Sequence, residues 1–240
     1  MKYIIMDIES TGLSVEHNEI TEISCLDCET LEQITWMVKI RKPKNCSKEA
    51  MYITNKTPEE LMSRGRYIEE VLDEISEFIL KGGIEIDEVC VIGHNVVNFD
   101  RKFLEYNFSS NGKKFPAIYY LDTLKMSKKY TKDILGIQKT SHKLNDLMIT
   151  ANIKTAETEN MHTSATDVRN NFRLWKKMIA DGMVNSLFIQ MSPEYLAEPS
   201  KVENKPIKKK GKKAKAEEYS LDDIMEEQST ESFFEEDNDD

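Results

Sequence analysis

The order of its apolar segments limits the folds open to this chain more than any other feature of its sequence. Three strand-like runs come first, at residues 2–8, 20–28 and 33–40. Two more short apolar runs, at 89–92 and 117–121, are separated by segments with helical periodicity. Consecutive strands that give way to alternating helices and strands are typical of a mixed sheet with helices on both faces. We therefore expect an α/β protein built on a five-stranded mixed sheet.

The helical segments are marked by apolar residues at intervals of three and four. They span residues 67–80, 98–108, 144–149 and 165–180. Thr57 followed by Pro58 predicts the start of a further helix, because Thr is a good N-cap and Pro suits the first turn.

Two regions of extreme charge follow the segments that build the sheet. Residues 205–215 carry seven Lys and no acid, whereas 216–240 carry twelve acids and no base. The net charge is −10 for the whole chain and −5 without these two regions. Net charge therefore does not decide whether the protein binds nucleic acid. We expect a folded domain at 1–182, a connector at 183–204 and a disordered tail over 205–240. The tail is too polar to bury the apolar surface that would offset its ordering entropy.

The apolar runs and the cysteines argue against a membrane or secreted protein and against a zinc protein. No apolar run approaches the roughly eighteen residues of a membrane span, and the first apolar stretch ends at Asp7, too early for a signal peptide. We therefore expect a cytoplasmic protein. Cys25 and Cys28 have the CxxC spacing, but a zinc site needs a second ligand pair, and none is found. We interpret both as small residues of a strand.

Two acids stand at the end of the first strand-like run. Asp7 and Glu9 are two residues apart, and residues at this spacing in a strand point to the same face. Acids that end a strand are commonly just solvated. Two on one face without a nearby Lys or Arg repel each other, however, and this favours a bound cation.

Asp100 follows the fourth strand-like run and falls in the first turn of a helix. Taken alone, its simplest role is to stabilise the positive end of the helix dipole. His162 and Asp167 form a third element. On one helix they would diverge by about 140°, so we expect His162 on a loop and Asp167 on the helix that follows. Taken alone, His162 is an ordinary surface histidine.

Together the three elements resemble the DEDDh (DnaQ-like) 3′→5′ exonucleases, a family that includes the proofreading epsilon subunit of bacterial DNA polymerase III, RNase T and oligoribonuclease. The resemblance covers residues 1–182 and is not confined to the acids. Further similar segments are the D-x-E-x-T-G-L opening at 7–13, an "I-T-x-x-T-x-E-x-L" stretch within 50–61, D-T-L at 122–124 and the segment at 142–147.

Two positions depart from the pattern of proofreading subunits. Ser10 replaces the commoner Thr, and three residues rather than two separate Asn95 from Phe99. The longer spacing resembles the exonuclease domains of family B polymerases. Neither change removes a ligand.

The resemblance implies a ribonuclease H-like fold and two bound Mg²⁺ or Mn²⁺ ions. Asp7 would bridge both ions. Glu9 and Asp167 would complete the site of one, and Asp100 would hold the other, mostly through water. His162 would act as the general base. The implied reaction is the release of 5′-mononucleotides from the 3′ end of single-stranded DNA, in proofreading, repair or DNA degradation in a bacterial or phage-infected cell.

The resemblance also suggests how the terminal nucleotide is held. The backbone amides of Thr11, Gly12 and Leu13 would contact it, with the Leu13 side chain wedged at its base. Glu49 and Thr54 stand where the family touches the terminal sugar. His94 and Asn95 are expected to shape a loop, and Asp122 to cap the helix after the fifth strand. Phe103, at helical spacing from Phe99, is expected in the core rather than stacked on a base.

Alternatives and partners also follow from the sequence. An exoribonuclease of the same fold would use the same chemistry and differ in its contacts with the 2′-OH. A module that docks on a polymerase or clamp, with secondary nuclease activity, is a second alternative. Residues 216–240 contain apolar islands, among them Phe233 and Phe234, and are expected to bind a DNA polymerase, sliding clamp or single-strand-binding protein. Alternatively, this acidic segment folds back on Lys205–Lys215.

Overall fold

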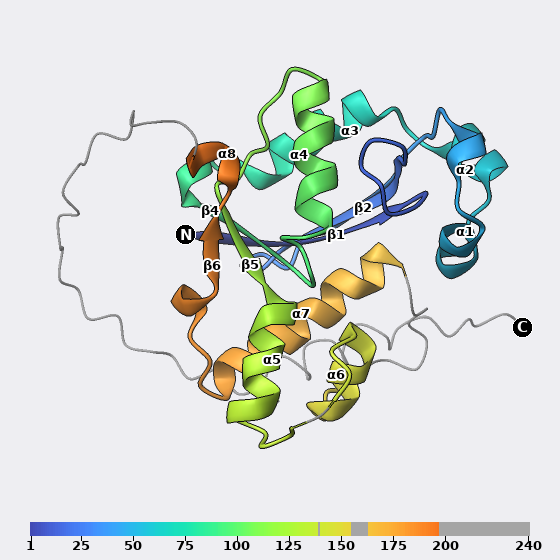
Figure 1. The fold of residues 1–240 in the computed structure, drawn as a ribbon. Coiled ribbons are helices and arrows are strands. Elements are labelled where there is room, and N and C mark those ends of the chain that lie inside the picture. Colours follow the sequence, from blue (N-terminus) through green and yellow to red (C-terminus); the bar gives the residue numbers. More distant parts are fainter. Residues whose placement is uncertain (139, 155–162, 197–240) are drawn as a thin grey trace, which may run out of the picture. The chain divides into compact units, whose positions relative to one another are not determined.

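The computed structural model describes residues 1–138, 140–154 and 163–196. Its centre is a six-stranded sheet with the order β3-β2-β1-β4-β5-β6 (Figure 1). β1 pairs with β4 and β4 with β5 in parallel, and the other neighbouring strands are antiparallel. The strands are β1 Lys2–Ser10, β2 Ile20–Asp27, β3 Gln33–Met37, β4 Val89–Gly93, β5 Tyr119–Asp122 and β6 Ile189–Met191. The expected mixed α/β, ribonuclease H-like sheet is confirmed.

Helices cover both faces of the sheet and enclose two separate cores (Figure 1). α3 (Ile68–Ile79) and α4 (Asp100–Ser110) bury apolar side chains in one core, and α5 (Thr123–Asp133), α6 (Leu144–Thr150) and α7 (Ser164–Ala180) in the other. Alternate residues of β1 enter opposite cores, as strand geometry requires. Ile4, Met6 and Ile8 join the α3–α4 core, whereas Ile5 joins the α7 core.

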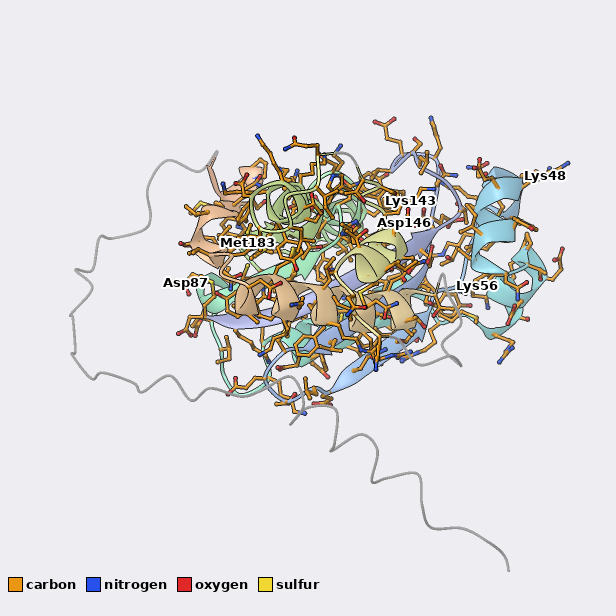
Figure 2. All side chains as sticks on the ribbon, turned by 90° about the horizontal axis from the view of Figure 1, so that it is seen from below. Lys48, Lys56, Asp87, Lys143, Asp146 and Met183 are labelled. Carbon is orange, nitrogen blue, oxygen red and sulfur yellow. The ribbon has the colours of Figure 1, made fainter. Side chains whose placement is uncertain are left out.

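Two short helices, α1 (Lys48–Thr54) and α2 (Pro58–Arg64), connect β3 to α3. The Oγ of Thr57 accepts a hydrogen bond from the N–H of Glu60, so the predicted N-cap is confirmed. Within the part of the chain that contains the sheet, Lys48 and Lys56 lie at the opposite end from Asp87 and Met183 (Figure 2). α1 was not predicted, because its seven residues carry no continuous apolar stripe.

The prediction of five strands was one strand short. β6 lies inside the segment expected to be a connector, where it pairs with β5 through Tyr119–Met191 and Leu121–Ile189. The 3-10 helix Asn185–Leu187 and α8 (Pro193–Leu196) flank it. A three-residue strand is too short to show the alternation from which strands are recognised. Of the helices described, none is both long and apolar enough to span a membrane.

Candidate metal centre

Asp7 and Glu9 lie on the half of β1 that extends past β4. They share the strand face of Ile5, which packs in the core beneath α7. The intervening Ile8 is buried on the opposite face, in the α3–α4 core. Both acids keep part of their surface exposed, so the predicted common face is open to ions.

α7 supplies a third carboxylate to this face. Its N-cap is Thr163, whose Oγ1 accepts a hydrogen bond from the N–H of Thr166, and Asp167 therefore lies in the first helical turn. One ligand oxygen each from Asp7, Glu9 and Asp167 lies within 4.8 Å of the other two. The structure thus brings together acids that are far apart in the chain.

Asp100 reaches the same strand from the other helical layer. It is the first residue of α4 and only 2% exposed, and its Oδ1 accepts a hydrogen bond from the N–H of Ile8 at 3.0 Å. The pairing of β1 with β4 ends at Ile5–Ile92, so β4 offers no carbonyl to the N–H of Ile8. The Asp100 carboxylate accepts this hydrogen bond instead. Asp100 is therefore anchored between Asp7 and Glu9 rather than merely stabilising the end of a helix.

The acids raise one another's pKa values in the absence of a cation. Burial raises the pKa of Asp7 well above its usual value, and repulsion from Asp100 and Asp167 adds to this. Burial and repulsion from Asp167 raise the pKa of Glu9 to about 8, although the Lys56 ammonium acts in the opposite direction. Burial likewise raises the pKa of Asp100 to about 7.

These carboxylates have the chemistry of a site for hard divalent cations. All of the donors are oxygens, as Mg²⁺ and Mn²⁺ prefer, and the mutual repulsion is relieved by a bound positive charge. Among the residues that the structure describes, Asp7, Glu9 and Asp167 are the one group that satisfies the geometry of a metal site. The described cysteines are free and form no such group. The donor set therefore fits the metal ions expected from the sequence.

Glu9→Gln is expected to stabilise the metal-free protein, and increasingly so as the pH rises. The pKa of Glu9 is higher in the folded protein than in the unfolded chain. Its favourable contribution to the free energy of unfolding is therefore complete below the unfolded-state pKa and is lost as the pH rises through about 8. The Gln side chain of the variant does not ionise, so the variant does not lose stability in this way. Thermal melts of both proteins in EDTA should show a Tm difference that grows between pH 5 and 8, by an amount of about 1–3 °C. A difference that stays constant with pH would contradict the assignment.

The loop after β1, which is predicted to contact the terminal nucleotide, is held by local contacts. Thr11 is buried, and its Oγ1 accepts a hydrogen bond from the N–H of Glu19. A Cβ on Gly12 would lie 2.7 Å from the Asn18 side chain. A larger residue there would displace the Asn18 amide, which hydrogen-bonds to Ser14 and Asn45. Leu13 is 86% exposed, so its side chain is accessible to a ligand.

The two residues predicted to contact the terminal sugar lie on α1, beside this loop. The N–H of Ser47, the N-cap of α1, donates to the carbonyl of Thr11. Glu49 is exposed in the first turn of the helix. Thr54 is buried and its hydroxyl donates to the carbonyl of Ala50, so that hydroxyl has only acceptor capacity left for a sugar. Their sugar contacts remain predictions.

Other residues singled out in the sequence have structural roles. Asp122 is the N-cap of α5 and accepts from the N–H of Leu124. His94 shapes its loop through hydrogen bonds to Thr123 and to the carbonyl of His142. Phe103 is fully buried, so its assignment to the core is confirmed. His162 lies outside the described residues, as does the whole tail from 205 to 240.

The sequence reasoning missed three residues next to the acids: Glu22, Lys56 and Ser164. Glu22 and Lys56 form an ion pair in which both side chains are almost completely buried. Glu22, flanked by Ile20 and Ile23 inside β2, was the available signal, because a charge in a buried strand needs a partner.

Comparison with known proteins agrees with the geometry. Residues 4–175 match the family model described as Exonuclease (RNase_T), and the chain therefore belongs to this exonuclease family. More particularly, the resemblance to the DEDDh (DnaQ-like) 3′→5′ exonucleases inferred from the sequence is confirmed.

Several similar curated proteins are PolC-type DNA polymerases III. That of Mycoplasmopsis pulmonis is 31% identical over 53% of this chain and 8% of its own length. That of Mycoplasma genitalium is 25% identical over 77% of this chain and 12% of its own length. The chain thus spans only about a tenth of these relatives.

Solved exonuclease structures share the fold. E. coli Exonuclease I in complex with a dT13 oligonucleotide has a TM-score of 0.60 at 18% identity, over 74% of this chain and 40% of that one. Exonuclease X in complex with 5′ overhanging duplex DNA has a TM-score of 0.56 at 20% identity, over 78% of this chain and 96% of that one.

Proposed function

We propose that this protein is a metal-dependent 3′→5′ exonuclease that releases 5′-mononucleotides from the 3′ ends of single-stranded DNA. The observation that carries this proposal is the convergence of the Asp7, Glu9 and Asp167 carboxylates within a chain of the exonuclease family. Asp100, anchored on β1 between the first two, completes a set of four acids.

The acids would hold two Mg²⁺ or Mn²⁺ ions. Asp7, at the centre of the set, would be shared by both ions, with Glu9 and Asp167 on one and Asp100 on the other. When bound, such ions lower the pKa of water and neutralise charge on a phosphodiester. The count of two is part of the proposal and rests on the four-acid motif.

The remaining residues would orient the strand and move the proton. His162, next to the N-cap of α7, is proposed as the general base, because its ordinary pKa lies close to the working pH. The amides of Thr11 to Leu13 would contact the terminal nucleotide. The exposed Leu13 side chain would lie against the terminal base and keep it out of the stack.

Purified protein with Mg²⁺ should digest single-stranded DNA faster than duplex DNA or RNA. The three substrates are 5′-labelled oligonucleotides of one sequence, compared side by side at equal concentration. A ladder that shortens one nucleotide at a time from the 3′ end is expected on single-stranded DNA. A phosphorothioate linkage at the 3′ end is the matched control and should delay the ladder.

RNA is the substrate of the principal alternative, an exoribonuclease of RNase T or oligoribonuclease type. The proposal favours DNA because the 50–61 and 122–124 segments resemble those of proofreading subunits. Faster digestion of RNA than of DNA in the same experiment would overturn the DNA assignment while leaving the nuclease assignment intact.

The wider setting of the reaction is also a proposal. The PolC-type relatives are DNA polymerases, which favours proofreading together with a DNA polymerase or its sliding clamp. A structure related in fold is described as an ExoI/SSB-Ct complex, which favours a single-strand-binding protein as a second partner. A module that only docks would have no need for four intact acids, so we place docking second to catalysis.

Truncation after Ile207 is expected to separate catalysis from recruitment. The proposed catalytic residues all lie before this point, so hydrolysis of short oligonucleotides should be unchanged. The removed segment carries Phe233 and Phe234 in an acidic context, which suits a docking peptide. Activity on DNA covered by single-strand-binding protein, or in the presence of polymerase and clamp, should therefore fall. Equal activity of full-length and truncated protein in these mixtures would count against docking.

A further inference from the structure

Glu22 is a buried acid beside the metal centre that has no place in the four-acid motif. It lies on β2 directly opposite Glu9 of β1, so both side chains share the sheet face beneath α7. Its side chain is only about a tenth exposed. Two acids opposite each other on adjacent strands are unfavourable without compensation, so Glu22 needs partners of its own.

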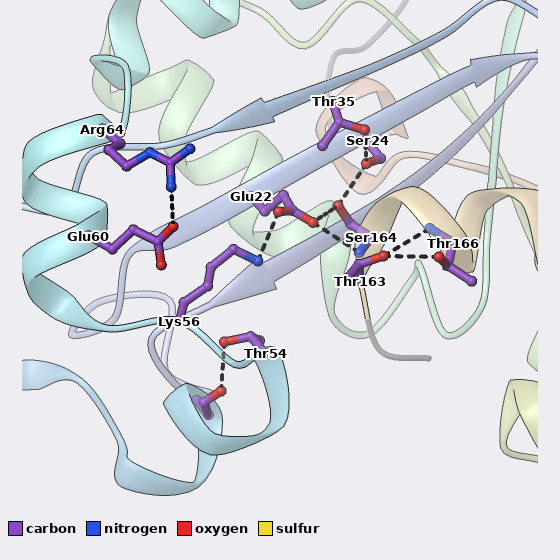
Figure 3. Close-up of polar contacts among 11 residues, drawn as sticks. Glu22, Ser24, Thr35, Thr54, Lys56, Glu60, Arg64, Thr163, Ser164 and Thr166 are labelled. Atoms are coloured by element: carbon purple, nitrogen blue, oxygen red, sulfur yellow. Dashed lines mark hydrogen bonds and ion pairs between the residues drawn. The ribbon is translucent and has the colours of Figure 1, made fainter. Parts of the chain in front are cut away.

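One oxygen of Glu22 holds the start of α7. Oε1 accepts a hydrogen bond from the N–H of Ser164 at 3.1 Å and another from its Oγ at 2.6 Å (Figure 3). Ser164 is the first residue of the helix, and Asp167 follows one turn later. Residues three apart in a helix are neighbours on its surface, so the anchor fixes the part of α7 that carries the metal-binding acid.

The other oxygen of Glu22 holds the segment that follows α1. Oε2 forms an ion pair with the Lys56 ammonium at 2.8 Å (Figure 3). Lys56 comes directly after Asn55, the C-cap of α1, and its side chain is only 7% exposed. The preceding Thr54 belongs to the proposed sugar-binding pair. One carboxylate therefore joins α7 to the end of α1.

A buried ion pair is weak evidence for stability, because desolvation of the two charges offsets most of their attraction. In some proteins such pairs are retained for the geometry that they fix. Here the geometry is that of the Asp7, Glu9 and Asp167 oxygens, which lie within 4.8 Å of one another.

We propose that Glu22 is a positioning residue of the metal centre, which sets Asp167 opposite Asp7 and Glu9 through Ser164 and ties the end of α1 to the same point through Lys56. The inference rests on the proposed function, since it assigns the acids to metal ions. Groups that orient metal ligands are usually worth about 10–100-fold in metal affinity or activity.

Two double variants of the full-length chain isolate the α7 anchor. Glu22→Gln/Lys56→Met removes both buried charges but keeps an oxygen that accepts from Ser164. Glu22→Leu/Lys56→Met removes the same charges with similar volume and has no acceptor. Calorimetric titration with Mn²⁺ should give a Kd about 10-fold weaker for the Leu variant than for the Gln variant. The kcat should fall in parallel, whereas KM for the oligonucleotide should be equal in both, because both lack Lys56. Equal Mn²⁺ affinity of the two would overturn the proposal.

A second comparison keeps the test valid if the Leu variant does not fold. Ser164→Ala removes the Oγ bonds to Glu22 and to Ser24, while Ser24→Ala removes only the bonds that Ser24 makes with Ser164 and Thr35. Ser164→Ala should weaken Mn²⁺ binding about threefold more than Ser24→Ala, the worth of one hydrogen bond. Equal Kd values in these two variants would also overturn the proposal.

The wild-type protein distinguishes failure of this inference from failure of the proposed function. A wild-type chain that neither binds Mn²⁺ nor digests DNA would contradict the exonuclease proposal itself. A wild-type chain that does both, with matched variants that bind Mn²⁺ equally, contradicts only the role of Glu22.

Discussion

Asp7→Ala is expected to abolish nucleotide release while the fold stays intact. Asp7 is close to both Glu9 and Asp167 and is electrostatically coupled to Asp100, so no other acid replaces it. Metal ions contribute several kcal/mol of charge stabilisation to phosphoryl chemistry, so the loss should be at least about 10³-fold in rate. The pKa of Asp7 is raised by burial and repulsion, so its removal should not lower the Tm of the metal-free protein.

The measurement is the initial rate of mononucleotide release with Mg²⁺, together with Mn²⁺ titration and a thermal melt. Asp87→Ala is the matched control, because Asp87 is exposed and lies far from α1 and α2 (Figure 2). The control should behave as wild type, and EDTA should reduce wild type to the level of Asp7→Ala. Digestion by Asp7→Ala at close to the wild-type rate would refute the metal centre.

His162→Gln is expected to lower kcat by about 10²–10⁴-fold, the usual worth of a positioned general base. Substrate affinity should change little, because the proposed role is confined to proton transfer. The wild-type rate should rise with pH through a limb near the ordinary pKa of histidine and then level off, and the variant should lack this limb.

The paired pH profiles decide whether the base is His162. His142→Gln is a useful control, because the hydrogen bonds that the structure describes join this histidine to Ser127 and His94 and not to any of the four acids. A His162→Gln variant with the full rate and the same pH limb would show that the proton is taken by another group.

The sequence predicted the elements whose periodicity spans several turns or a whole strand. β1 with its two acids on one face, the Thr57 cap of α2 and the placement of Asp167 on a helix were all confirmed. These features depend on neighbouring residues, so local pattern is sufficient. Family motifs then supplied the grouping of distant acids, which no local pattern contains.

The features that the sequence did not predict depend on contacts between distant segments. β6 is three residues long and becomes a strand because β5 offers it a free edge. The hydrogen bonds between Ser164 and Glu22 join residues 142 apart in the chain. A charged residue in a buried strand indicates that a partner is needed, but no local pattern points to Ser164. The hydrogen bond of Asp100 to Ile8 follows from where β4 ends, which sequence spacing does not reveal.

The most direct test of the central claim is the identity of the product released from single-stranded DNA by the wild-type protein. A 5′-labelled oligonucleotide is digested with Mg²⁺, and the small products are separated by chromatography against nucleoside 5′- and 3′-monophosphates. The exonuclease assignment predicts 5′-monophosphates, released one at a time from the 3′ end and only when the metal is present. Nucleoside 3′-monophosphates, internal cuts, or release that persists in EDTA would contradict it.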